Sequence, residues 1–244
     1  MSFTLYPAID IRDGRVVRLA QGDYARETRY EADPVALATA YAAAGAGWLH
    51  LVDLDAARDG GYTLSALLAR IHGEAGLRVQ TGGGVRGVED VERLLAGGAA
   101  RVVVGSVAIA TRTRVAGWIE RFGADRIVVA LDARCAADGT WRPASHGWTQ
   151  ASGDRLEDLV RFYAGVGLRH LLSTDIARDG MASGPSQDLY RLLLQWAPGV
   201  QLQASGGVRD AADVAAVRAL GCAGVVLGRS LLDGTLDLGE ALRC

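Results

Sequence analysis

Two aspartates at the ends of apolar runs are the residues best suited to proton transfer in this chain of 244 residues. Asp10 ends the run TLYPAID, and Asp132 ends the run IVVALD. A carboxylate accepts a proton as a general base, and it donates one as a general acid when burial or a neighbouring carboxylate raises its pKa. A single aspartate in such a place is more often a loop residue with satisfied hydrogen bonds. Two at equivalent positions predict a base and an acid acting on opposite sides of one substrate.

Short glycine-containing segments form a second group of candidate site residues. Each follows an apolar run and precedes a helical pattern, where glycine allows close approach of the backbone and the N–H groups that begin a helix attract an oxyanion. For one segment alone a simple turn explains the glycine equally well, but repeated segments at related positions favour phosphate binding. The predicted phosphate-binding residues are Gly83, Gly84, Gly105, Ser106, Gly206, Gly207, Gly228 and Arg229.

The candidate residues follow an internal repeat. The segment GGVRGVEDVERLLAGGAARVVVGS is matched by GGVRDAADVAAVRALGCAGVVLGR, and GAGWLHLVDLDAARDG is matched by GVGLRHLLSTDIARDG, each at an offset of about 122 residues. The same offset relates Asp10 to Asp132. Any two strand–helix units look somewhat alike, but a nearly constant offset over most of the chain favours a true duplication.

Apolar runs with strand character alternate with amphipathic helical patterns along the chain. This alternation predicts parallel strands, and eight strand–helix units predict an α/β fold, the (β/α)8 or TIM barrel. Because no linker separates the repeats, we expect one domain over 1–244, built from half-barrels of roughly 1–122 and 123–244. The predicted strands are 4–10, 49–52, 78–81, 101–104, 127–131, 170–172, 200–203 and 224–227.

A barrel of this kind places its chemistry at the carboxyl ends of the strands. Phosphate commonly binds there after the seventh and eighth strands, and the duplication adds a second site after the third and fourth. We therefore predict a small-molecule substrate with a phosphate group at each end. His50 and His170, which the repeat relates, fall at the starts of strands, where a role in stability is expected instead.

Composition excludes several classes of function. All 26 basic residues are arginine, which rules out Schiff-base aldolases, pyridoxal-phosphate enzymes and P-loop nucleotide binding. The segment GGGVRG satisfies a dinucleotide fingerprint but lacks the acidic residue expected after the next strand. No metal-ligand spacing is present, so neither a cofactor nor a metal is expected.

The net charge of −2 gives no reason to expect nucleic acid or a membrane surface as a partner. The N-terminal segment lacks the basic and apolar regions of a signal peptide, and no apolar run reaches the ~20 residues of a membrane span. We expect a cytoplasmic monomer.

Taken together, the motifs resemble the family of the histidine-biosynthesis isomerase that converts phosphoribosyl-formimino-aminoimidazole-carboxamide ribotide (ProFAR) to its ribulosyl form. The resemblance covers essentially the whole chain. It implies a duplicated half-barrel fold, a substrate with two phosphates, no cofactor or metal, and an Amadori rearrangement of an aminoaldose to an aminoketose. The motifs that carry it are PAIDIRDGRVVRLAQGDY, HLVDLDAA, QTGGGVR, RVVVGS, VVALDAR, HGW, TDIARDG, ASGGV and GVVLGRSLL.

The same resemblance implies roles for individual residues. Asp10 would be the proton acceptor, which removes the C2 proton, and Asp132 the proton donor, which protonates the ribose ring oxygen. Asp179 and Thr174 would support them, and the division of the acid role between Asp132 and Asp179 stays open. Substrate contacts are implied for Arg18 and Trp148, although a tryptophan that only packs its loop is an equal alternative for the latter.

Other functions on this fold remain as alternatives. A dual-substrate isomerase that also acts on phosphoribosyl anthranilate shares the motifs. The cyclase subunit of imidazole glycerol phosphate synthase resembles the chain at both aspartates but uses a lysine where this chain has Arg18. A phosphate-binding relative without catalysis is disfavoured because both aspartates are present.

Overall fold

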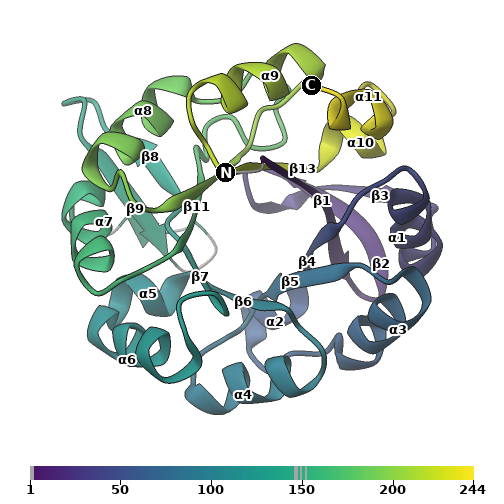
Figure 1. Ribbon diagram of the computed structural model, residues 1–244, viewed down its shortest axis with the longest axis horizontal. Helices are drawn as coiled ribbons and strands as arrows, with labels where there is room; N and C mark the ends of the chain where they lie inside the picture. The colour runs from purple at the N-terminus through teal and green to yellow at the C-terminus, as the bar shows by residue number, and fades with distance from the viewer. Residues whose placement is uncertain (1–2, 146–147, 149, 152) are drawn as a thin grey trace.

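The computed structural model describes residues 3–145, 148, 150–151 and 153–244. Parallel strands close into a barrel surrounded by helices (Figure 1), and β13 pairs with β1 to complete the ring, with Val226 opposite Tyr6. The predicted (β/α)8 barrel is confirmed. In ring order, its strands are β1 (Thr4–Arg12), β4 (Trp48–Asp53), β5 (Arg78–Gly82), β6 (Arg101–Val104), β7 (Ile127–Ala130), β11 (His170–Thr174), β12 (Gln201–Ser205) and β13 (Gly224–Leu227).

Amphipathic helices cover the outside of the barrel. In α1, Asp33 accepts hydrogen bonds from the backbone N–H groups of Val35 and Ala36, and Pro34 occupies the first helical position. Among the described residues, no helix combines the length and apolar character needed to cross a membrane. The helices are α1 (Pro34–Ala43), α2 (Leu54–Asp59), α3 (Ser65–Ala75), α4 (Val88–Ala96), α5 (Ser106–Ala110), α6 (Arg112–Phe122), α7 (Leu156–Gly165), α8 (Gln187–Trp196), α9 (Ala211–Ala219), α10 (Arg229–Leu232) and α11 (Leu238–Leu242).

The inside of the barrel is packed with side chains. Alternate residues of each strand point inward, and this inner cluster contains Ala8, Val128, Ala130, Leu172 and Val226, all buried. A larger cluster fills the space between the strands and the helices. The barrel is therefore a core rather than a pore, and its two ends are separate surfaces.

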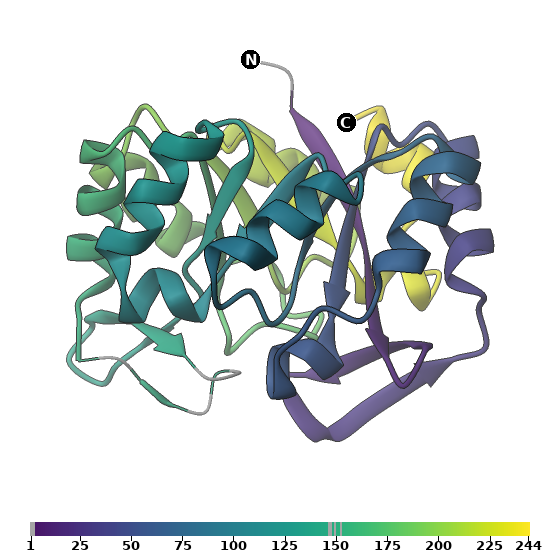
Figure 2. The same ribbon diagram turned by 90° about the horizontal axis from the view of Figure 1, so that it is seen from below.

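Two additions to the barrel were not predicted. A hairpin of β2 (Arg15–Ala20) and β3 (Asp23–Tyr30) continues directly from β1, and a small sheet of β8 (Ala133–Cys135), β9 (Trp141–Ser145) and β10 (Gln150–Ala151) follows β7. Figure 2 shows both at the same end of the barrel, opposite the start of β1. They extend the carboxyl ends of strands that come from opposite sides of the ring.

The hairpin turns have a local cause. Asp13 and Gly14 have φ of 48° and 71°, and Gln21 and Gly22 have φ of 54° and 72°. Consecutive positive φ values match the twist of two antiparallel strands, and a residue followed by glycine tolerates them best. The Asp-Gly pair was therefore a hairpin signal, and its consequence is that Arg18 is carried back over the barrel mouth.

Candidate active site

The three predicted acids meet at the carboxyl end of the barrel. Asp10 lies on β1, Asp132 lies two residues after the end of β7, and Asp179 lies in the loop between β11 and α8. All three are close enough for the charges of Asp10 and Asp132 to raise the pKa of Asp179. Segments more than a hundred residues apart thus bring their carboxyl groups to one mouth.

Asp10 is held by an ion pair. Its Oδ2 lies 2.6 Å from Nη1 of Arg18, which β2 places beside it because Asp10 pairs with Val17 in the antiparallel ladder. The Nη2 of Arg18 also donates to the carbonyl oxygen of Ala8 at 3.3 Å. Burial raises the pKa of Asp10, and the charge of Arg18 opposes that rise. The cation favours the ionised carboxylate, the form that a general base needs.

Asp132 accepts hydrogen bonds from uncharged groups instead. The backbone N–H of Thr174 lies 3.1 Å from its Oδ1, and the indole Nε1 of Trp148 lies 2.9 Å from its Oδ2. Thr174 reaches this position because β11 and β7 are neighbouring parallel strands. Burial raises the pKa of Asp132, and these hydrogen bonds act against that rise.

Asp179 has the environment of a proton donor. Burial raises its pKa to about 7; the charge of Arg18 opposes this rise, while the negative charges of Asp10 and Asp132 add to it. A carboxyl group with this pKa keeps its proton on a large fraction of molecules at neutral pH. Its repeat-related counterpart Asp59 differs, because its side chain is 64% exposed and forms an ion pair with Arg58 at the surface.

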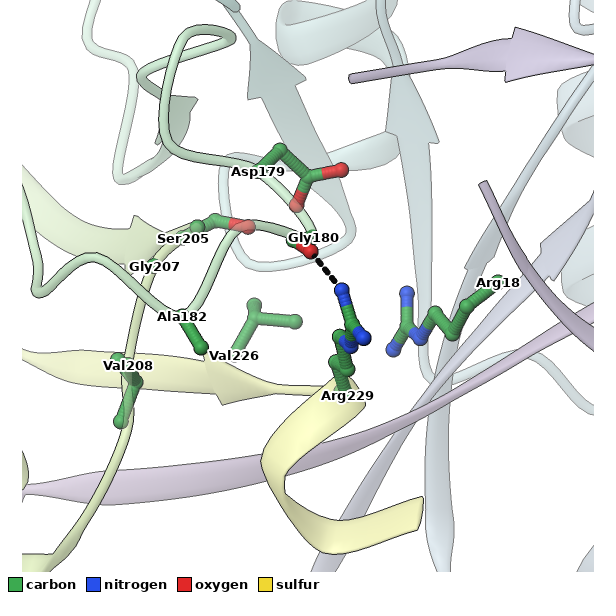
Figure 3. A pocket seen from close by; sticks show the side chains of 11 residues that line it. Arg18, Asp179, Gly180, Ala182, Ser205, Gly207, Val208, Val226 and Arg229 are labelled. Carbon is green, nitrogen blue, oxygen red and sulfur yellow. Dashed lines mark hydrogen bonds between the residues drawn. The ribbon is translucent and has the colours of Figure 1, made fainter. Parts of the chain in front are cut away.

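A cavity of about 40 Å³ lies beside these acids, bordered by all four of the predicted phosphate-binding residues from the second half of the chain. Its volume accommodates about three water-sized spheres, which suits one phosphate group. Figure 3 shows the guanidinium groups of Arg18 and Arg229 side by side at this cavity, with Arg229 donating to the carbonyl oxygen of Gly180. Two neighbouring cations favour an anionic occupant.

Other residues that border this cavity were missed by the sequence reasoning. Ser205 precedes the glycines of the motif ASGGV, and Gly180 ends the motif TDIARDG, so the motifs contained the signal for both. Ala182, Val208 and Val226 also border the cavity, and nothing in their type or spacing marked them.

The glycine pairs of the two halves share one backbone conformation. Gly83 and Gly84 have φ of 111° and 71°, and Gly206 and Gly207 have φ of 90° and 84°. These values lie in the left-handed region that glycine tolerates best. A Cβ at Gly84 would also overlap the carbonyl of Ala56, and one at Gly207 that of Gly184. The glycines are thus required by the local fold, independently of any ligand.

Gly105 and Gly228, which each precede a short helix, also share one backbone conformation, but their surroundings differ. Gly105 precedes Ser106 with φ −104° and ψ −93°, and Gly228 precedes Arg229 with φ −116° and ψ −92°. A Cβ at Gly228 would overlap the guanidinium of Arg18, whereas one at Gly105 would meet its nearest neighbour, the carbonyl oxygen of Ala130, at 3.9 Å. Of these two glycines, only Gly228 lies against Arg18 of the hairpin.

Trp148 connects the two unpredicted additions. Besides its hydrogen bond to Asp132, its ring lies against Gly22 at the turn between β2 and β3, where a Cβ would overlap it. It therefore both packs its own segment and contacts an active-site candidate, and its contact with substrate stays a prediction. His146, from the same HGW motif, lies outside the described residues. In the described part of the chain, no cluster of three or more His, Cys, Asp or Glu side chains is arranged to hold a metal ion.

Comparison with known proteins places this site in a family. Residues 4–237 match the family described as Histidine biosynthesis protein. A protein of Xanthomonas campestris pv. campestris (strain B100) is 61% identical over 244 residues, which is 100% of both chains. One of Stenotrophomonas maltophilia (strain R551-3) is 60% identical over the same full length. Both are named 1-(5-phosphoribosyl)-5-((5-phosphoribosylamino)methylideneamino)imidazole-4-carboxamide isomerase. The chain belongs to the histidine biosynthesis protein family.

Proposed function

We propose that this chain is the isomerase of histidine biosynthesis that converts ProFAR to its ribulosyl form. The compound named in both full-length relatives, the imidazole-4-carboxamide with two phosphoribosyl groups, is ProFAR. The observation that carries the proposal is the convergence of three carboxyl groups, with different partners, on one barrel mouth beside a phosphate-sized cavity. The reaction needs a base, an acid and anchorage for two phosphates, and each has candidates here.

The acid step opens the sugar ring. A protonated carboxyl group delivers its proton to the ribose ring oxygen, the C1–O bond breaks, and an iminium forms. Asp179 is suited to this role because its pKa of about 7 leaves about half of the molecules protonated at neutral pH. Asp132 shares the role in our proposal, since its hydrogen bonds from Thr174 and Trp148 orient it toward the same mouth.

The base step completes the rearrangement. Asp10 removes the proton from C2 of the iminium, which gives an enolamine, and tautomerisation of the enolamine gives the ketose. The proton lost from C2 balances the proton delivered to the ring oxygen, so the reaction is an isomerisation without net redox change. Arg18, 2.6 Å from Asp10, favours the ionised form of the carboxylate against the effect of burial and fixes its direction.

Phosphate binding positions the substrate between these groups. In the C-terminal half we assign one phosphate to Gly206, Gly207, Gly228 and Arg229, and in the other half the second phosphate to Gly83, Gly84, Gly105 and Ser106. Arg18 borders the first of these sites and also pairs with Asp10. Binding of that phosphate therefore acts on the same side chain that orients the base.

A turnover assay with ProFAR and phosphoribosyl anthranilate side by side tests the proposal. We expect turnover of ProFAR. Turnover of both compounds would show the dual-substrate isomerase, and absence of ProFAR turnover by folded protein would contradict the proposal.

A further inference from the structure

A second and larger cavity, of about 330 Å³, opens at the amino end of the barrel. It is formed by residues at the starts of the strands, among them Tyr6, Trp48, Arg101 and His170. The packed inner cluster lies between this cavity and the active-site mouth, and Val226 of that cluster borders the cavity at the other end. The cavity is thus a separate site that the proposed isomerisation does not use.

Two arginines give this cavity its charge. The guanidinium carbon of Arg101 lies 4.0 Å from the ring centroid of Trp48, and that of Arg78 lies 4.6 Å from it. Arg101 also donates to the hydroxyl oxygen of Tyr6 at 2.9 Å, which leaves the Tyr6 hydroxyl hydrogen available as a donor. The contacts hold both cations at the cavity without neutralising them, because an aromatic ring carries no net charge.

Buried polar atoms face the same cavity without partners. Gln203 is 1% exposed and His170 is 2% exposed, and both border the cavity. Oε1 of Gln203 accepts a hydrogen bond from Nε2 of Gln80 at 2.8 Å. The NH2 group of Gln203 is therefore not used in this contact. Within the described residues, Nε2 of Gln203 has no hydrogen-bond partner, and the nearest acceptor to Nε2 of His170 is Oδ1 of Asp125, at 3.6 Å. Buried polar groups are normally paired, so such groups beside a cavity indicate a ligand.

The balance of charge indicates that the ligand is an anion. Among the described residues the lining contains Arg78 and Arg101 and no carboxylate. Asp125 is the carboxylate beside His170, at 3.6 Å, and it is exposed and bound to Arg169 at 2.7 Å. Guanidinium groups bind the oxygens of phosphate or carboxylate groups through paired N–H donors, and an amide NH2 adds further donors.

We propose that this cavity binds a small phosphate ester, with inorganic phosphate as its minimal form. The cavity at the opposite end is sized for one phosphate group, and this one is about eight times larger. It has room for a phosphate at the two arginines and for a small organic group beside Gln203 and His170. The binding site is independent of the isomerase reaction.

Nuclear magnetic resonance of the tryptophan indole N–H groups tests this site directly. The Trp48 signal is assigned by its loss in Trp48→Phe, and the folded wild-type protein is titrated with inorganic phosphate, ribose 5-phosphate and succinate at constant ionic strength. We expect a saturable shift of the Trp48 signal with both phosphate compounds. Trp148 lies beside Asp132 at the other end of the barrel, so its signal reports changes at the active-site mouth and a shift confined to Trp48 identifies binding at the amino end.

Two variants and a matched control decide the result. Arg101→Gln is expected to weaken the event at Trp48 by about tenfold or more, the loss expected for a charge-assisted contact. If Arg101→Gln does not fold, Arg78→Gln takes its place, because Arg78 is exposed, and it is also expected to weaken the binding seen at Trp48. Arg112→Gln removes another arginine–aromatic contact, over Phe162 at 5.0 Å, and leaves binding unchanged.

Several results would overturn the proposal. They are no saturable shift at Trp48 up to about 10 mM ligand, an equal response in Arg101→Gln and Arg112→Gln, or a response to succinate alone. Because the readout is binding at Trp48, it stands or falls independently of ProFAR turnover. In the same variants, ProFAR turnover is expected to stay at the wild-type level.

Discussion

Asp10 and Asp132 occupy equivalent positions in the two halves of the barrel, yet their carboxylates have different partners. Asp10 faces the guanidinium of Arg18 at 2.6 Å, whereas Asp132 accepts hydrogen bonds from a backbone N–H and an indole. In the C-terminal half a second carboxyl group, Asp179, lies close enough to Asp132 for the two charges to interact. Its counterpart in the N-terminal half, Asp59, is exposed at the surface. The same backbone plan thus carries an ion-paired acid in one half and a pair of interacting acids in the other.

This difference gives the two halves different proton chemistry. A cation beside a carboxylate favours its ionised form, whereas burial near other carboxylates favours the protonated form. Two carboxyl groups whose surroundings separate their pKa values are the usual basis for assigning a base and an acid. We therefore assign the base to the N-terminal half and the acid to the C-terminal half.

The largest effect is expected for Asp10→Asn. An amide cannot accept the C2 proton, so kcat should fall by about a thousandfold or more, within the range known for lost acid–base groups. Substrate affinity should stay within about tenfold of wild type, because binding and proton transfer are separable. Steady-state kinetics and ligand titration measure the two, with Asp59→Asn as the matched surface control. Wild-type-like turnover in Asp10→Asn would sink the assignment.

Asp179→Asn should lower activity and raise stability at the same time. The folded protein holds the Asp179 proton up to a pKa of about 7, while the unfolded chain releases it near 3.8. The free energy of unfolding of the wild type therefore falls as pH rises through that window. At pH 8 the variant should be more stable by about 2 kcal/mol, with little difference at pH 4 and kcat lowered by about a hundredfold.

Urea unfolding at both pH values and a pH–rate profile measure these effects. The wild-type rate should decline above pH 7 as Asp179 loses its proton, and the residual rate of Asp179→Asn should lack that decline. Equal stability of the two proteins at pH 8 would show that the pKa of Asp179 is not raised in the folded protein.

Gly228→Ala, compared with Gly105→Ala, tests whether the two halves differ at the glycine that precedes the short helix. The new methyl group displaces Arg18 from Gly228 and so disturbs both the phosphate cavity and Asp10. We expect kcat/KM to fall by about thirtyfold, or about 2 kcal/mol, with a small change in Tm because the displaced group is a flexible side chain. Gly105→Ala, which meets nothing closer than 3.9 Å, is the matched variant and should have the smaller effect. Equal losses of kcat/KM in the two variants would show that displacement of Arg18 does not cause the effect.

Trp148→Phe has the smallest expected effect. It removes the indole N–H from Asp132 and keeps an aromatic ring against Gly22. One lost hydrogen bond to a charged acceptor corresponds to about tenfold in kcat/KM. The decline in rate at alkaline pH should also move to higher pH, because Asp132, acting as a proton donor, loses a hydrogen bond that lowers its pKa. An unchanged profile would mean that the indole only packs its segment.

Sequence patterns predicted the barrel well because its strands and helices carry strong local signals. The ends of strands were less certain: β11 runs to Thr174, beyond the predicted residue 172, because pairing with β12 continues it. The hairpin of β2 and β3 was missed, although Asp13-Gly14 is a turn signal, because β2 does not alternate between apolar and polar residues and β3 is mostly polar. Arg18 was reached only through a family resemblance, since nothing local shows that the hairpin folds it against Asp10.

The cavity at the amino end could not be predicted. His170 was expected to serve stability, Arg78 and Gln203 lie in none of the motifs, and Arg101 was noted only as the first residue of RVVVGS. Their juxtaposition depends on the closure of the barrel, which brings together the starts of strands spread over the whole chain.

Transfer of the C2 proton tests the central assignment most directly. ProFAR carrying deuterium at C2 of the reacting ribose is incubated with wild type, Asp10→Asn and Asp179→Asn, and loss of the label to solvent is followed in enzyme-bound substrate. Our account predicts release by the wild type with a primary isotope effect, and binding without release by Asp10→Asn. Release by Asp10→Asn at the wild-type rate would contradict the placement of the base in the N-terminal half of the barrel.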